Sequence, residues 1–356
     1  MLPHLFRRSI KILALNQVTC CFILSLICIT VLGAPVLAAL NGTETIITTD
    51  TTGSFQMNPS IYGDIIAWDD QRAGIGTNTI YAYNLLTGFE YPVLPDPANP
   101  YLWQTAPAVY GDWIVWQQDD SVNYNILAFN NNTLQIVPVP AMPKGLTDTS
   151  FSYFGTPPDN VLPRTNGTAV VWQDYTNDPH WGIYLYDLSF GSGGVSDPIL
   201  ADPGYDQKNP AISGDYIVYE NWSSGQSDIY LYFGVNKTAV RVSLFSNHDL
   251  NPSVDGTSIV WQRNNETTGF NAIYLYDILT GQTLQITPAG SLFNQVNAKI
   301  YGDLVVVEDD RDDGTMQVYA YHLDTSPFHE EWITPGSERM KINPAVFGNR
   351  IIWEDY

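Results

Sequence analysis

Carboxylates gather at regular points along the chain, and they are the first side chains that could do chemistry. The clusters are Asp69-Asp70, Asp119-Asp120, Glu308-Asp309-Asp310 with Asp312-Asp313, and Glu354-Asp355. Oxygen ligands in a ring suit Ca²⁺, so calcium is the one cofactor that these residues suggest. The spacing is not that of an EF-hand, because Arg311 falls on a ligand position. The alternative is that the aspartates cap turns and keep the surface soluble, with no cofactor.

Paired carboxylates could also hydrolyse a glycosidic bond. Here acids recur at the same place in several parts of the chain, as a structural role would require and a unique active site would not. The chain has no HExxH motif and no Gly-x-Ser-x-Gly nucleophile elbow. The histidines beyond the first 40 residues stand alone, at His180, His248, His322 and His329. We therefore assign no catalytic residue and favour a binding protein over an enzyme.

Aromatic and charged side chains in the predicted loops are the candidate ligand-binding residues. Aromatic faces stack on sugars and anchor protein contacts. One connection, which includes residues 141–158, is longer than its counterparts, and long loops in compact repeats often bind ligands. The candidates are Asp70, Arg72, Asp120, Tyr175, Trp181, Trp222, Arg263, Phe270, Asp310 and Arg311.

A repeat must position these side chains. A turn glycine recurs at Gly63, Gly111, Gly167, Gly214, Gly256, Gly302 and Gly348. Five residues after each glycine stands a bulky residue, at Trp68, Trp116, Trp172, Tyr219, Trp261, Val307 and Trp353. Each copy also contains an alternating aromatic segment such as Tyr274-Leu275-Tyr276. The recurring tryptophans and tyrosines are expected to pack neighbouring repeats together.

Each copy reads as four short strands, because apolar and polar residues alternate with the period of a half-buried strand. Four-stranded units of this length, repeated around an axis, predict an all-β fold, a β-propeller. Seven blades are expected in a single domain spanning residues 41–356. The seventh copy ends one strand short, which leaves six blades as the alternative. We expect the strand from Thr43 to Thr49 to join the C-terminal strands and close the ring.

The first 39 residues have the pattern of a secretory signal. Arg7, Arg8 and Lys11 precede an apolar run from Val18 to Leu32. Cleavage is expected after Ala38 or Ala39, and the alternative is an uncleaved membrane anchor. The three cysteines all lie in this segment, so the propeller itself has no thiol to form a disulfide or bind zinc.

Asn-x-Ser/Thr sequons beyond this segment also favour export, because such sites accept glycans outside the cytoplasm. They place candidate glycosylation sites at Asn41, Asn131, Asn166, Asn221, Asn236 and Asn265.

The charge of the chain argues against one class of partner. The formal net charge is −22, from 15 Lys and Arg against 37 Asp and Glu. A surface this acidic repels phosphate backbones, so no nucleic acid is expected as a partner. Contact with a membrane is expected only through the N-terminal segment, if it is retained.

The segment from Asn58 to Asp70, and its counterpart from Asn251 to Trp261, resemble the surface-type β-propeller repeat of methanogenic archaea, related to TolB-like and WD40-like propellers. The resemblance covers nearly all of the chain after the leader, although Ala106 replaces the repeated Asn in the second copy. It implies a secreted or cell-surface protein that binds or scaffolds without catalysis. The expected partner is an envelope protein or glycan, held at the loop face. The alternative function is an extracellular carbohydrate-active enzyme with an acidic pair near the central channel.

Overall fold

The structure is a computed structural model of the chain. It describes residues 9–15, 42–50, 53–72, 74, 77–93, 103–119, 124–139, 162–174, 180–193, 197–199, 204–223, 225–243, 247–265, 267–325, 327–335 and 339–356.

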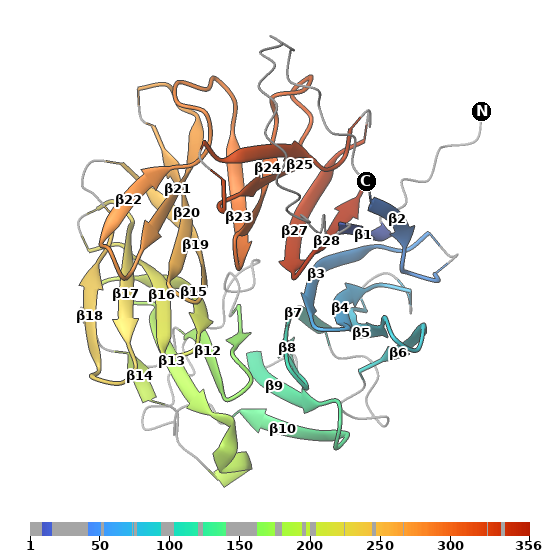
Figure 1. The fold of residues 1–356 in the computed structure, drawn as a ribbon. Coiled ribbons are helices and arrows are strands. Elements are labelled where there is room, and N and C mark those ends of the chain that lie inside the picture. The colour runs from blue at the N-terminus through green and yellow to red at the C-terminus, as the bar shows by residue number, and fades with distance from the viewer. Residues whose placement is uncertain are drawn as a thin grey trace, which may run out of the picture.

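Seven antiparallel sheets of four strands each stand around a common axis, so the chain folds as a seven-bladed β-propeller (Figure 1). In blades one to six, the four strands follow chain order from the ring axis outward. Blades one to three comprise β3 (Gln56–Tyr62), β4 (Ile65–Asp70), β5 (Thr79–Asn84) and β6 (Phe89–Pro92); β7 (Trp103–Tyr110), β8 (Trp113–Asp119), β9 (Tyr124–Asn130) and β10 (Gln135–Val139); and β11 (Arg164–Thr165), β12 (Ala169–Asp174), β13 (Gly182–Asp187) and β14 (Asp197–Ile199).

A short 3₁₀ helix, η1 (Leu188–Gly193), joins the last two strands of blade three. Blades four to six have the same strand order. These blades comprise β15 (Gln207–Ser213), β16 (Tyr216–Asn221), β17 (Asp228–Phe233) and β18 (Thr238–Arg241); β19 (Asp249–Asp255), β20 (Ser258–Asn264), β21 (Asn271–Asp277) and β22 (Gln282–Gln285); and β23 (Gln295–Tyr301), β24 (Leu304–Asp309), β25 (Gln317–His322) and β26 (His329–Trp332).

Blade seven takes strands from both ends of the chain. Its inner strands are β27 (Lys341–Phe347) and β28 (Arg350–Asp355), and its outer strands are β1 (Ser9–Leu15) and β2 (Gly42–Ile46). β1 pairs antiparallel with β28 from Ser9 opposite Asp355 to Ala14 opposite Arg350. This ladder closes the ring, which confirms the seven-bladed prediction and sets aside the alternative of six blades.

The closing strand differs from the expected one. The predicted strand at Thr43 to Thr49 does join blade seven, as β2, but it pairs with β1 and not with β28. β1 lies within the segment that the sequence pattern assigns to a leader. Its alternation explains the placement, because Ile10 and Ile12 are buried in the same cluster as Trp68 and Ile352.

The rest of the predicted leader lies outside the described residues, including the apolar run and the expected cleavage positions. Within the described part of the chain, no helix has the length and apolar character needed to cross a bilayer.

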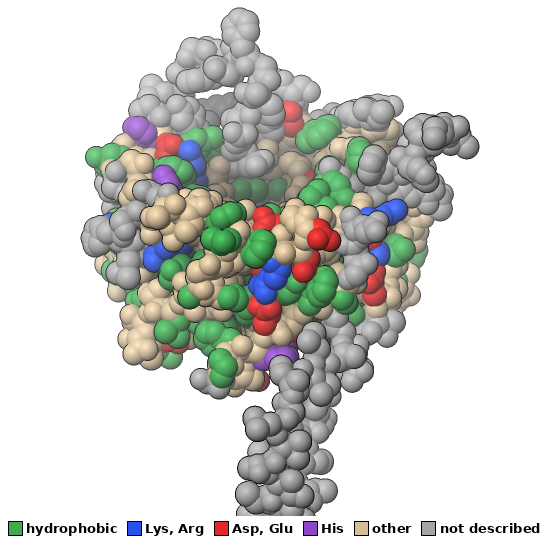
Figure 2. Space-filling model, turned by 90° about the horizontal axis from the view of Figure 1, so that it is seen from above, with side chains coloured by type: hydrophobic (Ala, Val, Ile, Leu, Met, Phe, Trp, Pro, Cys, Tyr) green, Lys and Arg blue, Asp and Glu red, His purple; other side chains and the backbone are tan. Residues whose placement is uncertain are grey.

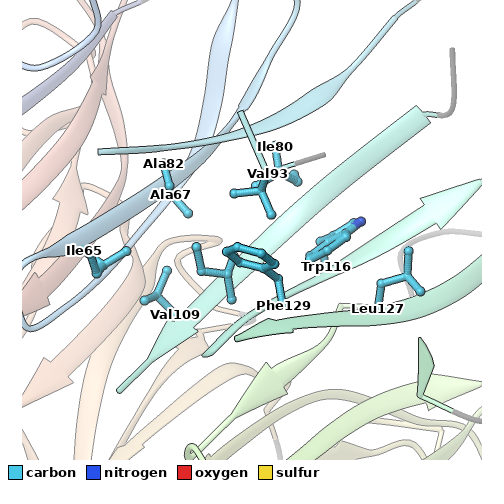
Figure 3. Close-up of a cluster of buried hydrophobic side chains, with 10 residues drawn as sticks. Ile65, Ala67, Ile80, Ala82, Val93, Val109, Trp116, Leu127 and Phe129 are labelled. Atoms are coloured by element: carbon cyan, nitrogen blue, oxygen red, sulfur yellow. The ribbon is translucent and has the colours of Figure 1, made fainter. Parts of the chain in front are cut away.

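The repeated residues form the turns and the core. All seven repeat glycines have positive φ, between 53° and 85°, which the hairpin between the first two strands of each blade requires. The bulky residue five positions later is buried in every blade. Several stack on a tyrosine of the third strand, as Trp261 does on Tyr274 at 6.1 Å between ring centroids. Figure 3 shows such a core between blades one and two, with Trp116 and Phe129 facing Ala67 and Val93.

Candidate functional site

A second positive-φ position recurs in the inner strands, where an asparagine begins a bulge. Its φ lies between 50° and 52° in five blades, and Ala106 takes the position in blade two with φ 55°. Asparagine tolerates this left-handed conformation better than other residues with side chains. The bulge interrupts the register between the first two strands, for example between Met57 and Ser60. The five asparagines are Asn58, Asn209, Asn251, Asn297 and Asn343.

These asparagines build a circular hydrogen-bond network. In blade six, Asn297 Nδ2 donates to Glu308 Oε1 of the same blade at 2.7 Å. The backbone N–H of Asn297 donates to Gln262 Oε1 of blade five at 3.0 Å. The same pair of bonds recurs at Asn58, Asn209, Asn251 and Asn343. Six shared acceptors thus join neighbouring blades in turn, from blade three round the ring to blade two. They are Gln173, Glu220, Gln262, Glu308, Glu354 and Asp69, and Asp69 reaches blade two by accepting from Thr105 at 2.6 Å.

The acids of this network have perturbed protonation. Burial raises the pKa of Asp69 to about 7, and the neighbouring Glu354 carboxylate adds to the effect. Burial also raises the pKa of Glu220 and Glu308, against hydrogen bonds that lower it. Raised carboxyl pKa values are common at active sites, but a unique catalytic pair would break the repeat. These acids occur at the same repeat position in their blades, and glutamine occupies that position in blades three and five. This recurrence favours a structural role.

Three of the candidate binding residues are arginines held inside their own blades. Arg263 pairs with the fully buried Asp249 through two hydrogen bonds of 2.7 and 2.9 Å and lies 4.3 Å from the ring centre of Tyr274. Arg72 pairs in the same way with Asp70 at 2.7 Å, and with Glu90.

Arg311 completes this group. It pairs with Asp309 at 2.5 Å and with Glu330 at 2.7 Å, and it lies 4.4 Å from the ring centre of Tyr319. These arginines thus pair with two carboxylates of the acidic clusters, Asp70 and Asp309. Among the described residues, no three His, Cys, Asp or Glu side chains gather as potential metal ligands.

The other charged and aromatic candidates are scattered. Asp310 accepts hydrogen bonds from the backbone and side chain of Asn294 at 2.7 and 3.0 Å, so it orders the turn ahead of β23. Phe270 is half-buried, and its carbonyl accepts a hydrogen bond from the N–H of Asn265 at 2.9 Å. Asp120, Tyr175 and the long connection 141–158 lie outside the described residues.

The structure brings two candidates together, Trp181 and Trp222, on either side of one short segment. The N–H of Trp181 donates to Asp206 Oδ1 at 3.1 Å, and the N–H of Trp222 donates to the Asp206 carbonyl at 2.9 Å. Lys208 Nζ lies 2.8 Å from Asp206 Oδ2 and 5.5 Å from the ring centre of Trp222.

Two histidines border the same place. The His248 ring centre lies 5.5 Å from that of Trp222, and His180 Nδ1 lies 3.6 Å from Asp206 Oδ1. We call these six residues the Trp222 cluster: His180, Trp181, Asp206, Lys208, Trp222 and His248. Its charged side chains are about a third exposed, at 31% for Asp206 and 30% for Lys208. Against the effect of burial, the hydrogen bond from Lys208 lowers the pKa of Asp206, so this carboxylate stays charged at neutral pH.

The Trp222 cluster breaks the repeat, and this is the signal that sequence reasoning missed at Lys208. The corresponding position, one before the bulge asparagine, carries an uncharged residue in the other described blades, at Met57, Thr105, Leu250, Val296 and Ile342. Trp222 also donates from Nε1 to Glu220 Oε2 at 3.3 Å, which connects the cluster to the circular network.

The candidate glycosylation sites differ in their accessibility. Asn236 and Asn265 are exposed, and their side chains order the turns that follow them. Asn131 and Asn166 are half-buried, and Asn166 Nδ2 already donates to the Gly214 carbonyl at 2.8 Å. Asn221 is fully buried, so a glycan there would require local unfolding. Asn41 lies outside the described residues.

Comparison with known proteins identifies the fold. No protein-family model and no curated protein matches the chain. Among solved structures, it is similar to the β-propeller domain of the trilobed protease from Pyrococcus furiosus, with 13% identity, a TM-score of 0.60, and coverage of 83% of this chain and 87% of that one. It is also similar to TolB from Acinetobacter baumannii, with 18% identity, a TM-score of 0.51, and coverage of 80% and 67%.

Full-length peptidases are matched only in part. An acylaminoacyl peptidase from Pyrococcus horikoshii shares 14% identity at a TM-score of 0.60, over 87% of this chain and 50% of the peptidase. The chain thus spans about half the length of such enzymes. At these identities the similarity establishes a propeller like those of TolB and of peptidase propeller domains, and no activity.

Proposed function

We propose that this protein is an extracellular or cell-surface propeller that binds an envelope protein or glycan at its loop face, without catalysis. The Trp222 cluster is the observation that carries the proposal. It lies where the inner strand of blade four begins and its second strand ends, next to loops that vary from blade to blade. The leader pattern, the sequons and the resemblance to archaeal surface-type repeats support the extracellular location.

The chemistry of the cluster suits a sugar or a polar protein surface. The Trp222 indole supplies apolar area, and Lys208 and Asp206 supply a donor and an acceptor beside it. Tryptophan is enriched among the residues that contribute most to protein binding, and aromatic faces stack on sugars. The surrounding sheets hold these side chains in place, which lowers the entropic cost of ordering them on binding.

The test is capture from solubilised native cell envelope, followed by titration of the purified captured molecule. We expect the wild-type protein to retain a defined protein or glycan. Trp222→Ala should weaken binding by at least about 10-fold, the scale of a central aromatic contact.

The matched control is Phe89→Ala, because Phe89 is a largely exposed aromatic of an outer strand, away from the cluster. It should leave the affinity unchanged. Equal loss in both variants, or full affinity in Trp222→Ala, would show that the cluster is not the binding site. Release of trimmed glycan fragments would instead favour the carbohydrate-active enzyme.

A further inference from the structure

Two cations interrupt the repeat on the inner strands, at the position three residues before each turn glycine. Five blades carry serine or alanine there. Blade three carries Arg164 and blade six carries Lys299. The seven residues are Ser60, Ala108, Arg164, Ala211, Ser253, Lys299 and Ala345.

The ring brings these two cations near each other. β11 and β23 are inner strands, and blades three and six stand across the axis from one another (Figure 1). Burial lowers the pKa of Lys299 to about 8, and the Arg164 guanidinium contributes by charge repulsion. Burial lowers the pKa of Arg164 as well. Both side chains are partly buried on inner strands of opposite blades, so two like charges lie in a partly buried place near the axis.

Neither cation forms an ion pair with a described carboxylate. Arg164 Nη1 donates to the carbonyl of Pro163 at 2.9 Å, and Lys299 Nζ donates to Asn297 Oδ1 at 2.7 Å. Glu308 is close enough to favour the charged form of Lys299. Its Oε1, however, accepts from the side chain of Asn297 and the backbone of Asn343. Poorly solvated charges are costly without an opposite charge nearby, so this place favours an anion.

We propose that the ring axis binds the carboxylate group of a ligand between Arg164 and Lys299. The guanidinium presents a planar set of donors that matches a carboxylate, and the ammonium retains donors beyond its bond to Asn297. Glu308 offsets part of the positive charge of Lys299. The remaining positive charge is therefore expected to favour a monoanionic carboxylate over a dianionic phosphate.

Aromatic rings adjoin this site and indicate what carries the carboxylate. One residue before the turn glycine, on the same side of the inner strands, stand Tyr301, Phe347, Tyr62 and Tyr110. The centroid of Phe347 lies 4.4 Å from those of Tyr301 and Tyr62, and Tyr62 lies 3.9 Å from Tyr110. This arc spans blades six, seven, one and two. It offers an apolar surface to the body of a peptide chain end or of a uronic acid.

The experiment measures the melting temperature of the full chain with matched ligands at constant ionic strength. N-acetylglycylglycine is compared with its neutral amide, and glucuronate with glucose. A ligand that binds only the folded state raises the melting temperature, and the rise grows with the ratio of ligand concentration to Kd. We expect at least one carboxylate to raise it above its neutral counterpart, and the pair that responds identifies a peptide or a sugar source.

The variants take the residues that other blades use, so they are expected to fold. Arg164→Ala and Lys299→Ser should each abolish the carboxylate response. Their melting temperature in chloride alone should equal or exceed that of the wild type, because the charge repulsion is gone. Lys237→Ser, at an exposed turn of blade four, should respond like the wild type. If Arg164 and Lys299 only stabilise the fold, both variants should melt at a lower temperature than the wild type. No protein, including the wild type, should then respond to a carboxylate.

Several results would overturn the proposal: no difference between carboxylates and their neutral counterparts, a response that persists in both variants, or a stronger response to inorganic phosphate. This site is distinct from the Trp222 cluster, so Trp222→Ala should keep the carboxylate response even if the proposed function fails.

Discussion

At the scale of the residue, one acid of the circular network stands apart from its equivalents. Asp69 is the shortest side chain among the acceptors. Its Oδ2 accepts from Asn58 and Thr105 at 2.7 and 2.6 Å, whereas its buried Oδ1 has no partner among the described residues. Deprotonation therefore places a charge beside the Glu354 carboxylate with only one oxygen solvated by hydrogen bonds.

This environment makes folding stability depend on pH. The pKa of the Asp69 carboxyl rises from an ordinary value of 3.8 to about 7 in the folded chain. The folded state therefore binds more protons than the unfolded state between these values, and stability from this group falls as pH rises through that interval. Asp69→Asn does not titrate, so its free energy of unfolding should lose this slope, and above pH 7 it should exceed that of the wild type by about 1–4 kcal/mol.

Urea unfolding at a series of pH values from about 4 to 8 measures the slope. Asp303→Asn is the control, because Asp303 is exposed in a hairpin turn and its replacement should keep the wild-type slope. Parallel curves for the wild type and Asp69→Asn would show that Asp69 titrates normally in the folded protein.

At the scale of the element, blade seven combines strands from the two ends of the chain. β1 is held by more than its ladder with β28. Lys11 pairs with Asp355 at 2.5 Å, and Asp355 also pairs with Lys341 of β27 at 2.6 Å. This ion pair network joins three strands of the blade, so β1 contributes to closure through both apolar and charged contacts.

Two isoleucines in the adjacent strands test the role of β1. Ile10 in β1 is fully buried, whereas Ile46 in β2 is 59% exposed. Ile10→Asp should lower the free energy of unfolding by about 3 kcal/mol or more, because it buries an unpaired charge. Ile46→Asp should change it by less than about 0.5 kcal/mol.

Urea unfolding of the two variants expressed from the full chain gives the comparison. Equal stability of Ile10→Asp and the wild type would mean that β1 is absent from the folded product, as cleavage after Ala38 or Ala39 would cause. Blade seven would then depend on β2 alone for closure, as the sequence pattern suggested.

At the scale of the whole molecule, a strongly acidic chain closes into a compact ring. On one face, basic side chains lie next to acidic ones, and Figure 2 shows blue and red groups that adjoin there. The internal pairs of Arg72, Arg263 and Arg311 use several of the 15 Lys and Arg, which leaves a large excess of the 37 Asp and Glu. Such an excess destabilises a compact state through self-repulsion.

Salt should therefore stabilise the propeller. Raising NaCl from about 0.1 M to about 1 M shortens the screening length from roughly 10 Å to about 3 Å, which weakens repulsion between surface carboxylates more than it weakens buried ion pairs. The melting temperature should rise by several degrees. Glucose at matched osmolality is the uncharged control and should give a smaller rise. A melting temperature that falls with NaCl would mean that surface ion pairs outweigh the repulsion.

Local sequence signals are enough to predict the architecture of this protein. Strand alternation, turn glycines and a bulky apolar residue five positions later recur in every copy, and each is a local signal that needs no distant contact. They predict four-stranded blades and a propeller of seven, and the structure has both. The same local reading found Trp181 and Trp222 as aromatics outside the repeat pattern.

Two features became known only from the fold: the strand that closes the ring, and the side chains that contact one another. Arg263 looked available for a ligand until the fold placed Asp249 against it, and the closing strand proved to be β1. Arg164 and Lys299 are far apart in the chain and come together only across the axis. The physical reason is that a repeat encodes each blade locally, whereas contacts between strands and across the axis exist only once the blades are packed into a ring.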